Sequence, residues 1–536
     1  MYRYLTALTV ILAALNPANA QDYDVSELQT RAEFSYFEET TRYEEVMSFL
    51  RAAVLASDRL HLTEFGYTTE GRKLPLLVYG DVWDATPGEV IRTGKTRVFV
   101  QANIHAGEVC GKEALLMLIR ELASGQYADW ADSLVLLMVP IYNADGNERI
   151  SLYNRPRQHG PAGGMGQRPN AQGFDLNRDH MKLDAPEARS LVRLMNEYDP
   201  HVLIDLHTTN GTVHGYHLTY SPPLNPNTAD PIIDLLRERW LPEVRNAIRE
   251  IYGWEFYYYG NVPRTGSTRE PGWYTFDHRP RFNNNYVGLR NRIAILSEAY
   301  SYAAFEERIL ATLAFVKENL HYAHRHAALI RETLETVDLE TVVGREMAVR
   351  SEFARSAEPV DILLGEVAET LNPYTGEVMY LREETLIPTS MYEYGKFTAV
   401  ETERAPRTYF VPPSLAVVIE RLGAHGVWFE ELSSPREMAL ERFRIDSTRV
   451  AERPFQGRHE RTLFGKYEPV VRTLEAGTLV VPVDQQLGRL IFYLLEPRSD
   501  DGLVAWALMD DVLEDATYYP ILREPADRQQ PADGQP

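Results

Sequence analysis

Strands and helices alternate in the hydrophobic pattern of the first 335 residues. The run "TRVFVQANIH" (96–105) is apolar over most of its length and predicts a buried strand. The next segment, "GKEALLMLIREL" (111–122), carries its apolar residues on one broad face and predicts a helix. The same two patterns predict strands over 133–142, 201–207 and 292–300 and a helix over 184–198. Such alternation indicates a largely parallel or mixed sheet that helices cover on both faces.

Shorter signals complete this first part of the chain. Residues 25–57 carry helical periodicity, and residues 62–80 predict two short strands around a turn at Gly71. The segment "NADGNE" (143–148) follows one of the buried strands and predicts a turn, because Asn, Asp and Gly favour turn conformations.

The pattern changes after about residue 335. From there short apolar runs such as "TYFVPP" (408–413) and "RLIFYLLEP" (489–497) are separated by turns. They predict a second, β-rich α+β region over residues 336–524. The last twelve residues, 525–536, are polar and proline-containing, so a disordered tail is expected there.

The N-terminus has the pattern of a secretory signal peptide. Arg3 precedes the apolar run "LTALTVILAAL", and "ANA" at positions 18–20 is a small-x-small cleavage site. Residues 1–20 are therefore expected to be removed. No other segment reaches membrane-spanning length, so the mature chain is expected to be soluble and exported.

Charge and cysteine content narrow the range of partners. The 536 residues include 77 acidic and 55 basic side chains, a formal net charge of −22. That excess argues against nucleic acid and anionic membranes as partners. The single cysteine, Cys110, excludes an internal disulfide, and an exported protein without such bonds fits a bacterial periplasm or the medium.

Four polar residues lie at the ends of three predicted strands. His105 and Glu108 follow the first strand directly, His207 ends the second, and Glu298 lies at the end of the third. In open α/β sheets the carboxyl ends of the strands form the binding crevice. Two imidazoles and one carboxylate, with a fourth position left for water, are the ligand set of a catalytic zinc site.

The spacing of His105 and Glu108 alone carries little weight. With 14 histidines and 77 acidic residues, a His-x-x-Glu pair is expected about once by chance. A second pair does occur at His61 and Glu64, on a predicted amphipathic strand without a comparable partner nearby, and we interpret it as surface. The placement at strand ends is what distinguishes the first pair.

Five segments in order resemble the zinc carboxypeptidases of the carboxypeptidase A and B type. They are "HAGE", "YNADGNER", "GFDLNRDH", "DLHT" and "ILSEAY", and the resemblance covers roughly residues 22–325. It implies an α/β/α sandwich on a mixed eight-stranded sheet, with the catalytic domain over residues 21–335. It also implies one zinc ion per chain and a peptide substrate with a free C-terminal carboxylate.

The resemblance implies a role for each matched residue. His105, Glu108 and His207 would hold the zinc ion, which lowers the pKa of a water and polarises the scissile carbonyl. Glu298 would be the general base that takes the proton of the water and passes it to the leaving amine. Asp175 would orient His105 from behind and so select its tautomer.

Arginines near "GFDLNR" are implied to bind the substrate. Asn177 and Arg178 would hold its terminal carboxylate, Arg178 through its planar fork of donors. Arg168 is our choice for stabilising the oxyanion of the tetrahedral intermediate. Arg155 and Arg157 remain competitors for that role, because the glycine-rich segment between them and Arg168 makes the spacing unreliable.

The sequence departs from the family pattern before Glu298. The tyrosine that closes over the substrate has no clear counterpart, and Tyr274 and Tyr286 are both candidates. The residues that set side-chain preference cannot be aligned. Four arginines crowd this stretch, at positions 279, 281, 290 and 292. A preference for an acidic terminal residue is one interpretation, and a solvated basic face is the one that we favour.

Two other functions share the same residues. A zinc amidohydrolase that removes an acyl group from an amino acid would use the same ligand set with a different pocket. A non-catalytic exported binding protein would use the same cleft. The retained "LNR" element favours the peptidase over the deacylase, and the presence of Glu298 with all three ligands favours an enzyme over a binding protein.

Overall fold

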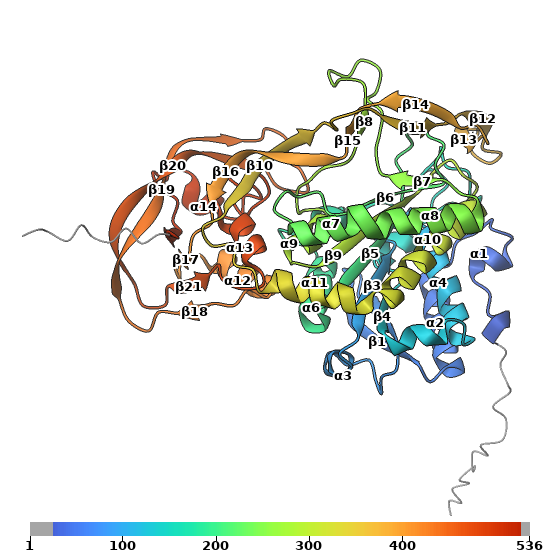
Figure 1. Cartoon of the computed structure of the whole chain (residues 1–536), viewed down its shortest axis with the longest axis horizontal. Helices are drawn as coiled ribbons and strands as arrows, with labels where there is room; N and C mark the ends of the chain where they lie inside the picture. The colour runs from blue at the N-terminus through green and yellow to red at the C-terminus, as the bar shows by residue number, and fades with distance from the viewer. Residues whose placement is uncertain (1–24, 527–536) are drawn as a thin grey trace, which may run out of the picture.

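An eight-stranded mixed sheet lies at the centre of the N-terminal part of the protein (Figure 1). The computed structural model describes residues 25–526, so the expected signal peptide and all but two residues of the expected tail lie outside the described residues. The strands, in their order across the sheet, are β1 (Leu60–Tyr67), β2 (Lys73–Tyr79), β4 (Leu134–Val139), β3 (Thr96–Ala102), β5 (Val202–Thr208), β9 (Ile293–Ala299), β6 (Leu218–Ser221) and β7 (Phe256–Tyr258). This confirms the mixed eight-stranded sheet expected from the sequence.

The four central strands β4, β3, β5 and β9 run parallel to one another. Strands β1 and β2 pair antiparallel at one side, and β6 runs antiparallel to β9 at the other. The carboxyl ends of β3, β5 and β9 therefore meet at one edge of the sheet. This edge receives all four polar residues that the sequence places at strand ends.

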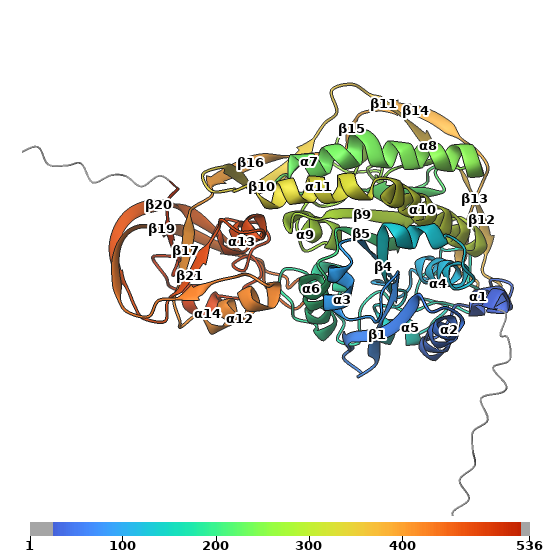
Figure 2. The same ribbon diagram turned by 60° about the horizontal axis from the view of Figure 1, so that its bottom comes forward.

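Helices cover both faces of the sheet (Figure 2). One face packs against α2 (Tyr43–Ala56), α4 (Cys110–Ala123), α8 (Leu241–Tyr252), α10 (Phe305–Arg325) and α11 (Ala327–Asp338). The other face packs against α3 (Pro87–Arg92), α6 (Pro186–Tyr198) and α9 (Asn283–Leu289). Smaller elements are η1 (Val25–Glu27), α1 (Arg31–Phe34), η2 (Ala128–Asp132), α7 (Asp230–Asp234) and the π-helical η4 (Leu235–Trp240).

Burial on both faces explains the continuous apolar runs in the sequence. On β3, Val98 and Val100 pack into the core beneath α4 and α10, whereas Phe99 packs into the core on the opposite face. Successive side chains of a strand point to opposite faces, so a strand covered on both sides needs apolar residues at every position.

None of the helices between residues 25 and 526 combines the length and the apolar character that a membrane span requires.

The segment "NADGNE" forms a short helix, α5 (Ala144–Glu148), and the prediction of a turn alone was wrong. Asn143 caps this helix, because its Oδ1 accepts a hydrogen bond of 3.0 Å from the backbone N–H of Gly146. Asn and Asp side chains satisfy backbone donors in turns and at helix starts alike, so their presence does not distinguish the two.

The C-terminal region is β-rich, as expected, and contains a six-stranded sheet (Figure 1). Its strands, in order, are β18 (Glu430–Glu431), β21 (Leu479–Pro482), β17 (Thr408–Val411), β22 (Leu522–Glu524), β19 (Arg436–Val450) and β20 (Arg461–Leu474). Three short helices accompany it: α12 (Ala416–His425), α13 (Gly488–Leu495) and α14 (Asp510–Leu513).

Two-stranded ribbons connect this sheet to the far end of the N-terminal part, across the top of the view in Figure 1. They pair β10 (Glu346–Ala354) with β16 (Lys396–Arg404), β11 (Val360–Leu364) with β14 (Ile387–Met391), and β12 (Val367–Leu371) with β13 (Val378–Arg382). A parallel bridge joins β15 (Glu393–Tyr394) to β8 (Trp273–Tyr274) of the N-terminal part. The C-terminal region thus extends along the N-terminal part.

Three of the four arginines before Glu298 are buried and Arg279 is only partly exposed, so the interpretation as a solvated basic face was wrong. Arg281 is 2% exposed and forms ion pairs of 2.7 Å with Asp501 and with Glu460, both from the C-terminal region. Arg292 is 6% exposed and pairs with Asp199 at 2.8 Å. The carboxylates that neutralise Arg281 lie about 180 and 220 residues further along the chain, so the local sequence contains no sign of them.

Candidate active site

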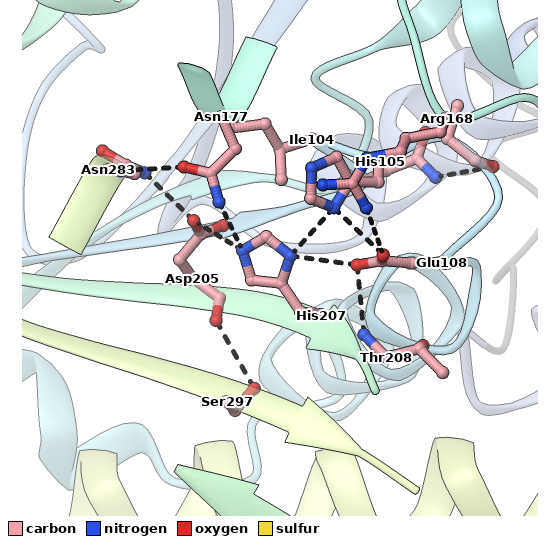
Figure 3. Close-up of polar contacts among 12 residues, drawn as sticks. Ile104, His105, Glu108, Arg168, Asn177, Asp205, His207, Thr208, Asn283 and Ser297 are labelled. Carbon is pink, nitrogen blue, oxygen red and sulfur yellow. Dashed lines mark hydrogen bonds and ion pairs between the residues drawn. The ribbon is translucent and has the colours of Figure 1, made fainter. Parts of the chain in front are cut away.

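His105, Glu108 and His207 converge at the carboxyl edge of the sheet (Figure 3). One ligand atom from each lies within 4.8 Å of the others, and all three side chains are buried. His105 Nδ1 lies 3.0 Å from Glu108 Oε1, and His207 Nδ1 lies 2.9 Å from Glu108 Oε2. His105 and Glu108 come from the turn between β3 and α4, and His207 from the end of β5.

Each imidazole turns its other nitrogen toward a buried aspartate. His105 Nε2 lies 3.0 Å from Asp175 Oδ1, and His207 Nε2 lies 3.0 Å from Asp205 Oδ2. A carboxylate can only accept a hydrogen bond, so each Nε2 can donate to its aspartate. If a cation took the place of the Nδ1 contacts with Glu108, each ring would keep its proton on Nε2, and both Nδ1 lone pairs would point into the cluster.

The donor set fits a divalent cation such as zinc. The two Nδ1 atoms are only 3.3 Å apart and share the space beside a carboxylate, an arrangement of lone pairs that a cation between them would stabilise. Although burial favours the neutral ring, Asp205 and Glu108 raise the pKa of His207 well above its usual value. The surrounding carboxylates therefore favour positive charge at this point.

Asp205 also lies at the site, next to His207, but was not predicted from the sequence. It is fully buried and also accepts a hydrogen bond of 3.2 Å from Asn283 Nδ2. A signal was available in "DLH", because residues two apart on a strand point to the same face. Asp205 and His207 are therefore held on the same side of β5.

Asp175, Asn177 and Arg178 lie together on the loop beside the cluster. Asn177 and Arg178 belong to a 3-10 turn, η3 (Leu176–Arg178), which Asp175 caps by accepting from the Asn177 N–H at 2.9 Å. The carbonyl of the Asn177 side chain accepts from the Asn283 N–H at 2.8 Å, so its amide group faces His207 at 3.5 Å.

Two of the three competing arginines lie at the cluster. Arg155 donates to Glu108 Oε1 at 2.7 Å, and Arg168 donates to Asp175 Oδ2 at 2.8 Å while its guanidinium lies 3.6 Å from Glu108. Arg157 instead lies over the ring of Tyr380. The structure therefore leaves Arg168 and Arg155 near the ligands and separates Arg157 from them.

A cavity of about 100 Å³ adjoins the cluster. Its lining residues are His105, Glu108, Arg168, Asn177, Arg178, His207, Asn210, Tyr259, Phe276, Phe282, Leu296 and Glu298. Arg178 lies with its guanidinium 3.7 Å from the centroid of the Phe282 ring and donates to the Asn177 carbonyl at 2.6 Å. Burial lowers the pKa of Arg178 to about 10. Among residues 25–526 it forms no ion pair, although the nearby Asp175 and Asp277 act against the lowering of its pKa, and its side chain lines the cavity.

Glu298 reaches the same cavity from the end of β9, where it lies opposite His207 in the strand register. Its Oε2 atom is buried and has no hydrogen-bond partner among the described residues. Burial raises the pKa of this carboxyl to about 8. An unpartnered carboxylate oxygen beside the metal cluster is therefore available to a water or substrate group.

Neither tyrosine candidate from the sequence lines this cavity. The hydroxyl of Tyr286 is bound to His425 Nδ1 at 2.8 Å inside the core shared with the C-terminal region. Tyr274 stacks on Tyr394 with ring centroids 4.0 Å apart. Tyr259 lines the cavity instead. The sequence contained a signal for this position, because Tyr259 directly follows β7 and so lies at the end of a strand, as the metal-binding candidates do.

A buried His-Glu-His cluster at the carboxyl edge of a mixed α/β sheet, beside an unpartnered glutamate, is typical of a metal-dependent hydrolase. Residues 46–276 match the family model of the zinc carboxypeptidases, a segment that contains His105, Glu108 and His207 and ends before Glu298. This segment of the protein therefore resembles a zinc carboxypeptidase domain, and the match supports a peptidase.

The chain is also similar to several proteins of known name. The chain is 24% identical over 505 residues to "Carboxypeptidase 2" of Trichophyton rubrum, covering 90% of this chain and 86% of that protein. It is 24% identical over 485 residues to "Probable carboxypeptidase 2" of Arthroderma benhamiae, covering 86% and 85%. Among solved structures, the carboxypeptidase A of Helicoverpa armigera aligns with a TM-score of 0.40 at 17% identity, covering 55% of this chain and 75% of that chain.

Proposed function

We propose that the protein is a zinc-dependent carboxypeptidase that hydrolyses the C-terminal peptide bond of peptides. The environment of the Arg178 side chain is the observation that supports this proposal best. Its guanidinium faces a small cavity beside the metal cluster, and no carboxylate of residues 25–526 forms an ion pair with it. A largely desolvated cation favours an anionic ligand, and its planar fork of donors matches a terminal carboxylate.

His105, Glu108 and His207 would hold one zinc ion, with Asp175 and Asp205 keeping the two rings in the tautomer that presents Nδ1. Bound there, zinc would polarise the scissile carbonyl and lower the pKa of a water.

Glu298 would take the proton of the attacking water and pass it to the leaving amine, since its Oε2 is free of other partners. Arg168 lines the cavity and would donate to the oxyanion, whereas Arg155 is not among the residues that line it. Asn177 and Arg178 would hold the terminal carboxylate of the peptide. Tyr259 lines the same cavity and would pack against the bound residue.

A matched pair of substrates tests the role of Arg178. A peptide with a free C-terminus and the same peptide amidated would be compared at one concentration of zinc-loaded enzyme. A charge-assisted pair is worth about 1.5–3 kcal/mol, so amidation is expected to lower kcat/KM roughly 10- to 150-fold. In Arg178→Ala the ratio between acid and amide should fall to near one.

Equal cleavage of acid and amide by the wild type would refute the exopeptidase assignment and indicate an endopeptidase. An N-acyl amino acid is a necessary third substrate, because a deacylase would also read a free carboxylate. Faster release of the acyl group than of a C-terminal residue from any peptide would favour the amidohydrolase.

We also propose that the protein is exported after removal of residues 1–20, and that residues 336–524 form an accessory region to the catalytic domain of residues 21–335. The "ANA" cleavage site supports export. Expression of the full gene product with its leader, followed by N-terminal sequencing of the processed protein, should give Gln21 as the first residue. Retention of Met1 in the exported protein would contradict cleavage.

A further inference from the structure

A tight turn between β19 and β20 brings the C-terminal region to the loop of residues 166–185, here called the site loop. Phe455 and Arg458 exchange two backbone hydrogen bonds, of 2.8 and 3.0 Å. Between them, Gln456 and Gly457 have φ of 49° and 80°. Two consecutive left-handed residues are typical of a type I′ turn, which favours asparagine and glycine at these positions. Glutamine at the first position has an unfavourable backbone, and such a residue often marks a functional constraint.

The side chain of Gln456 contacts the site loop directly. Its Oε1 accepts a hydrogen bond of 2.8 Å from the backbone N–H of Asp175, 281 residues away in the sequence. A backbone N–H can only donate, so this contact also fixes which atom of the Gln456 amide is the oxygen. A Cβ atom at Gly457 would lie 3.3 Å from the ring of Phe174, so the turn packs closely on the residue before Asp175.

Asp175 connects the site loop to the metal cluster. Its Oδ1 lies 3.0 Å from His105 Nε2 and accepts from the Asn177 N–H at 2.9 Å, while its Oδ2 accepts from Arg168 at 2.8 Å. Its backbone carbonyl accepts from the Arg178 N–H at 2.9 Å. A shift of the Asp175 backbone would therefore change the orientation of His105 together with the side chains that are proposed to bind substrate.

Two ion pairs hold the same segment of the C-terminal region against the N-terminal part. Arg458 donates from two nitrogens to the two carboxylate oxygens of Asp184, at 2.8 Å each. Glu460 accepts from Arg281 at 2.7 Å, and the Arg281 side chain is buried. A two-point arginine–carboxylate pair has a defined geometry, so the turn is held against the site loop and does not project into solvent.

We propose that Gln456 is a positioning residue of the active site, through which the C-terminal region holds Asp175 and, through Asp175, His105 in place. Gln456 does not line the cavity itself, so it acts through the backbone of the site loop. Within that loop the only regular element is the three-residue turn η3, so its conformation depends on contacts of this kind. The inference rests on the proposed zinc-dependent function.

The exchange Gln456→Asn separates the contact with Asp175 from the stability of the turn. Asparagine tolerates a left-handed backbone better than glutamine, so the midpoint of urea unfolding should be unchanged or higher. Its carbonyl falls about 1.5 Å, the length of one carbon–carbon bond, short of the Asp175 N–H. The site loop then has to be ordered when zinc binds, and the zinc Kd should rise about 3- to 10-fold. Competition with a chromophoric chelator measures this ratio without any substrate.

Two further exchanges at the same position test whether the acceptor atom is the cause. Gln456→Met keeps the length of the side chain but removes the strong acceptor, so its zinc Kd should rise like that of Gln456→Asn. Gln456→Glu keeps an acceptor at the same reach, and its zinc Kd should stay within about twofold of the wild type. In zinc-saturated enzyme, kcat/KM for a peptide should follow the same order among the variants.

The exchange Gln485→Met is the matched control. Gln485 also belongs to the C-terminal region, and its Oε1 accepts from a backbone N–H, that of Trp428, at 3.0 Å. Its amide group donates to carbonyls of the same region, so none of these contacts involves the site loop. Gln485→Met should lower the unfolding midpoint and leave the zinc Kd as in the wild type.

The outcomes separate this inference from the proposed function. Wild-type zinc affinity in both Gln456→Asn and Gln456→Met would overturn the inference, and peptide hydrolysis would still support the carboxypeptidase. An equally large rise of the zinc Kd in Gln456→Glu or Gln485→Met would also overturn it, because the acceptor at position 456 would then not be the cause. The expected order of zinc affinities without hydrolysis of any peptide would refute the proposed function and support Gln456 as a positioning residue of the metal site.

Discussion

Asp205→Asn is expected to weaken zinc binding although Asp205 does not itself face the metal cluster. Its carboxylate accepts from His207 Nε2 at 3.0 Å, from Asn283 Nδ2 at 3.2 Å and from Gln101 Nε2 at 3.3 Å. All three neighbours donate, and an asparagine has only one oxygen to accept with. Its NH₂ group therefore faces either His207 and Asn283 or Gln101, and the Gln101 amide can turn its unpartnered Oε1 toward that group.

If that NH₂ group faces His207, the imidazole has to accept at Nε2, and its proton moves to Nδ1. The ring then presents an N–H to the cluster in place of the lone pair that a metal needs. If the amide oxygen faces His207 instead, the hydrogen bond survives but the charge that strengthens it is lost. Both arrangements weaken His207 as a ligand.

The magnitude follows from the single interaction that changes. A hydrogen bond to a charged group contributes about 1.5–3 kcal/mol, and loss of a residue that supports a metal-binding histidine typically lowers metal affinity about 10- to 100-fold. We therefore expect the zinc Kd of Asp205→Asn to rise roughly 10- to 100-fold. Competition with a chromophoric chelator at fixed pH measures this ratio directly.

Asp81→Asn is the matched control, because the Asp81 side chain is 79% exposed and lies on the surface. It removes the same charge from the chain and should leave the zinc Kd unchanged. A wild-type zinc affinity in correctly folded Asp205→Asn would refute the reasoning, since it would mean that Asp205 does not determine which nitrogen of His207 carries the proton.

Two further predictions concern catalysis and stability. Glu298→Gln keeps the shape of the side chain but cannot accept a proton, so kcat should fall at least about 100-fold while zinc content is retained; loss of the metal instead would make Glu298 a ligand. Burial lowers the pKa of His425 in the folded protein to about 3. Below pH 6.5 this histidine therefore takes up a proton in the unfolded chain but not in the folded protein, and the free energy of unfolding decreases as the pH falls. Between pH 7 and 5 this histidine should cost about 2 kcal/mol; His425→Gln should remove that part of the pH dependence in urea unfolding, and an unaltered dependence would contradict it.

The alternation of apolar runs was enough to predict the architecture of the N-terminal part. Strands buried on both faces must be apolar at every position, whereas helices need only one apolar face, so the two periodicities separate β3 and β5 from α4 and α6 along the chain. The β-rich character of the C-terminal region was predicted in the same way. The sequence could not distinguish a turn from the start of a helix at Asn143, because asparagine is common in both.

The gathering of His105, Glu108, His207 and Glu298 also follows from the sequence, given parallel strands. Each lies at the carboxyl end of an apolar run, and parallel strands bring those ends to one edge. The family resemblance then assigned a role to each. Asp205 was overlooked, although its place on the same face of β5 as His207 is readable from strand periodicity.

Only the tertiary structure decided which side chains from remote segments meet. The partners of Arg281 lie in the C-terminal region, and so does the histidine that holds the Tyr286 hydroxyl away from the cavity. Periodicity reports which face of an element is buried, but it carries no information on what covers that face. Contacts between residues more than a hundred positions apart depend on how whole layers pack. In this protein, such contacts decide which tyrosine lines the cavity.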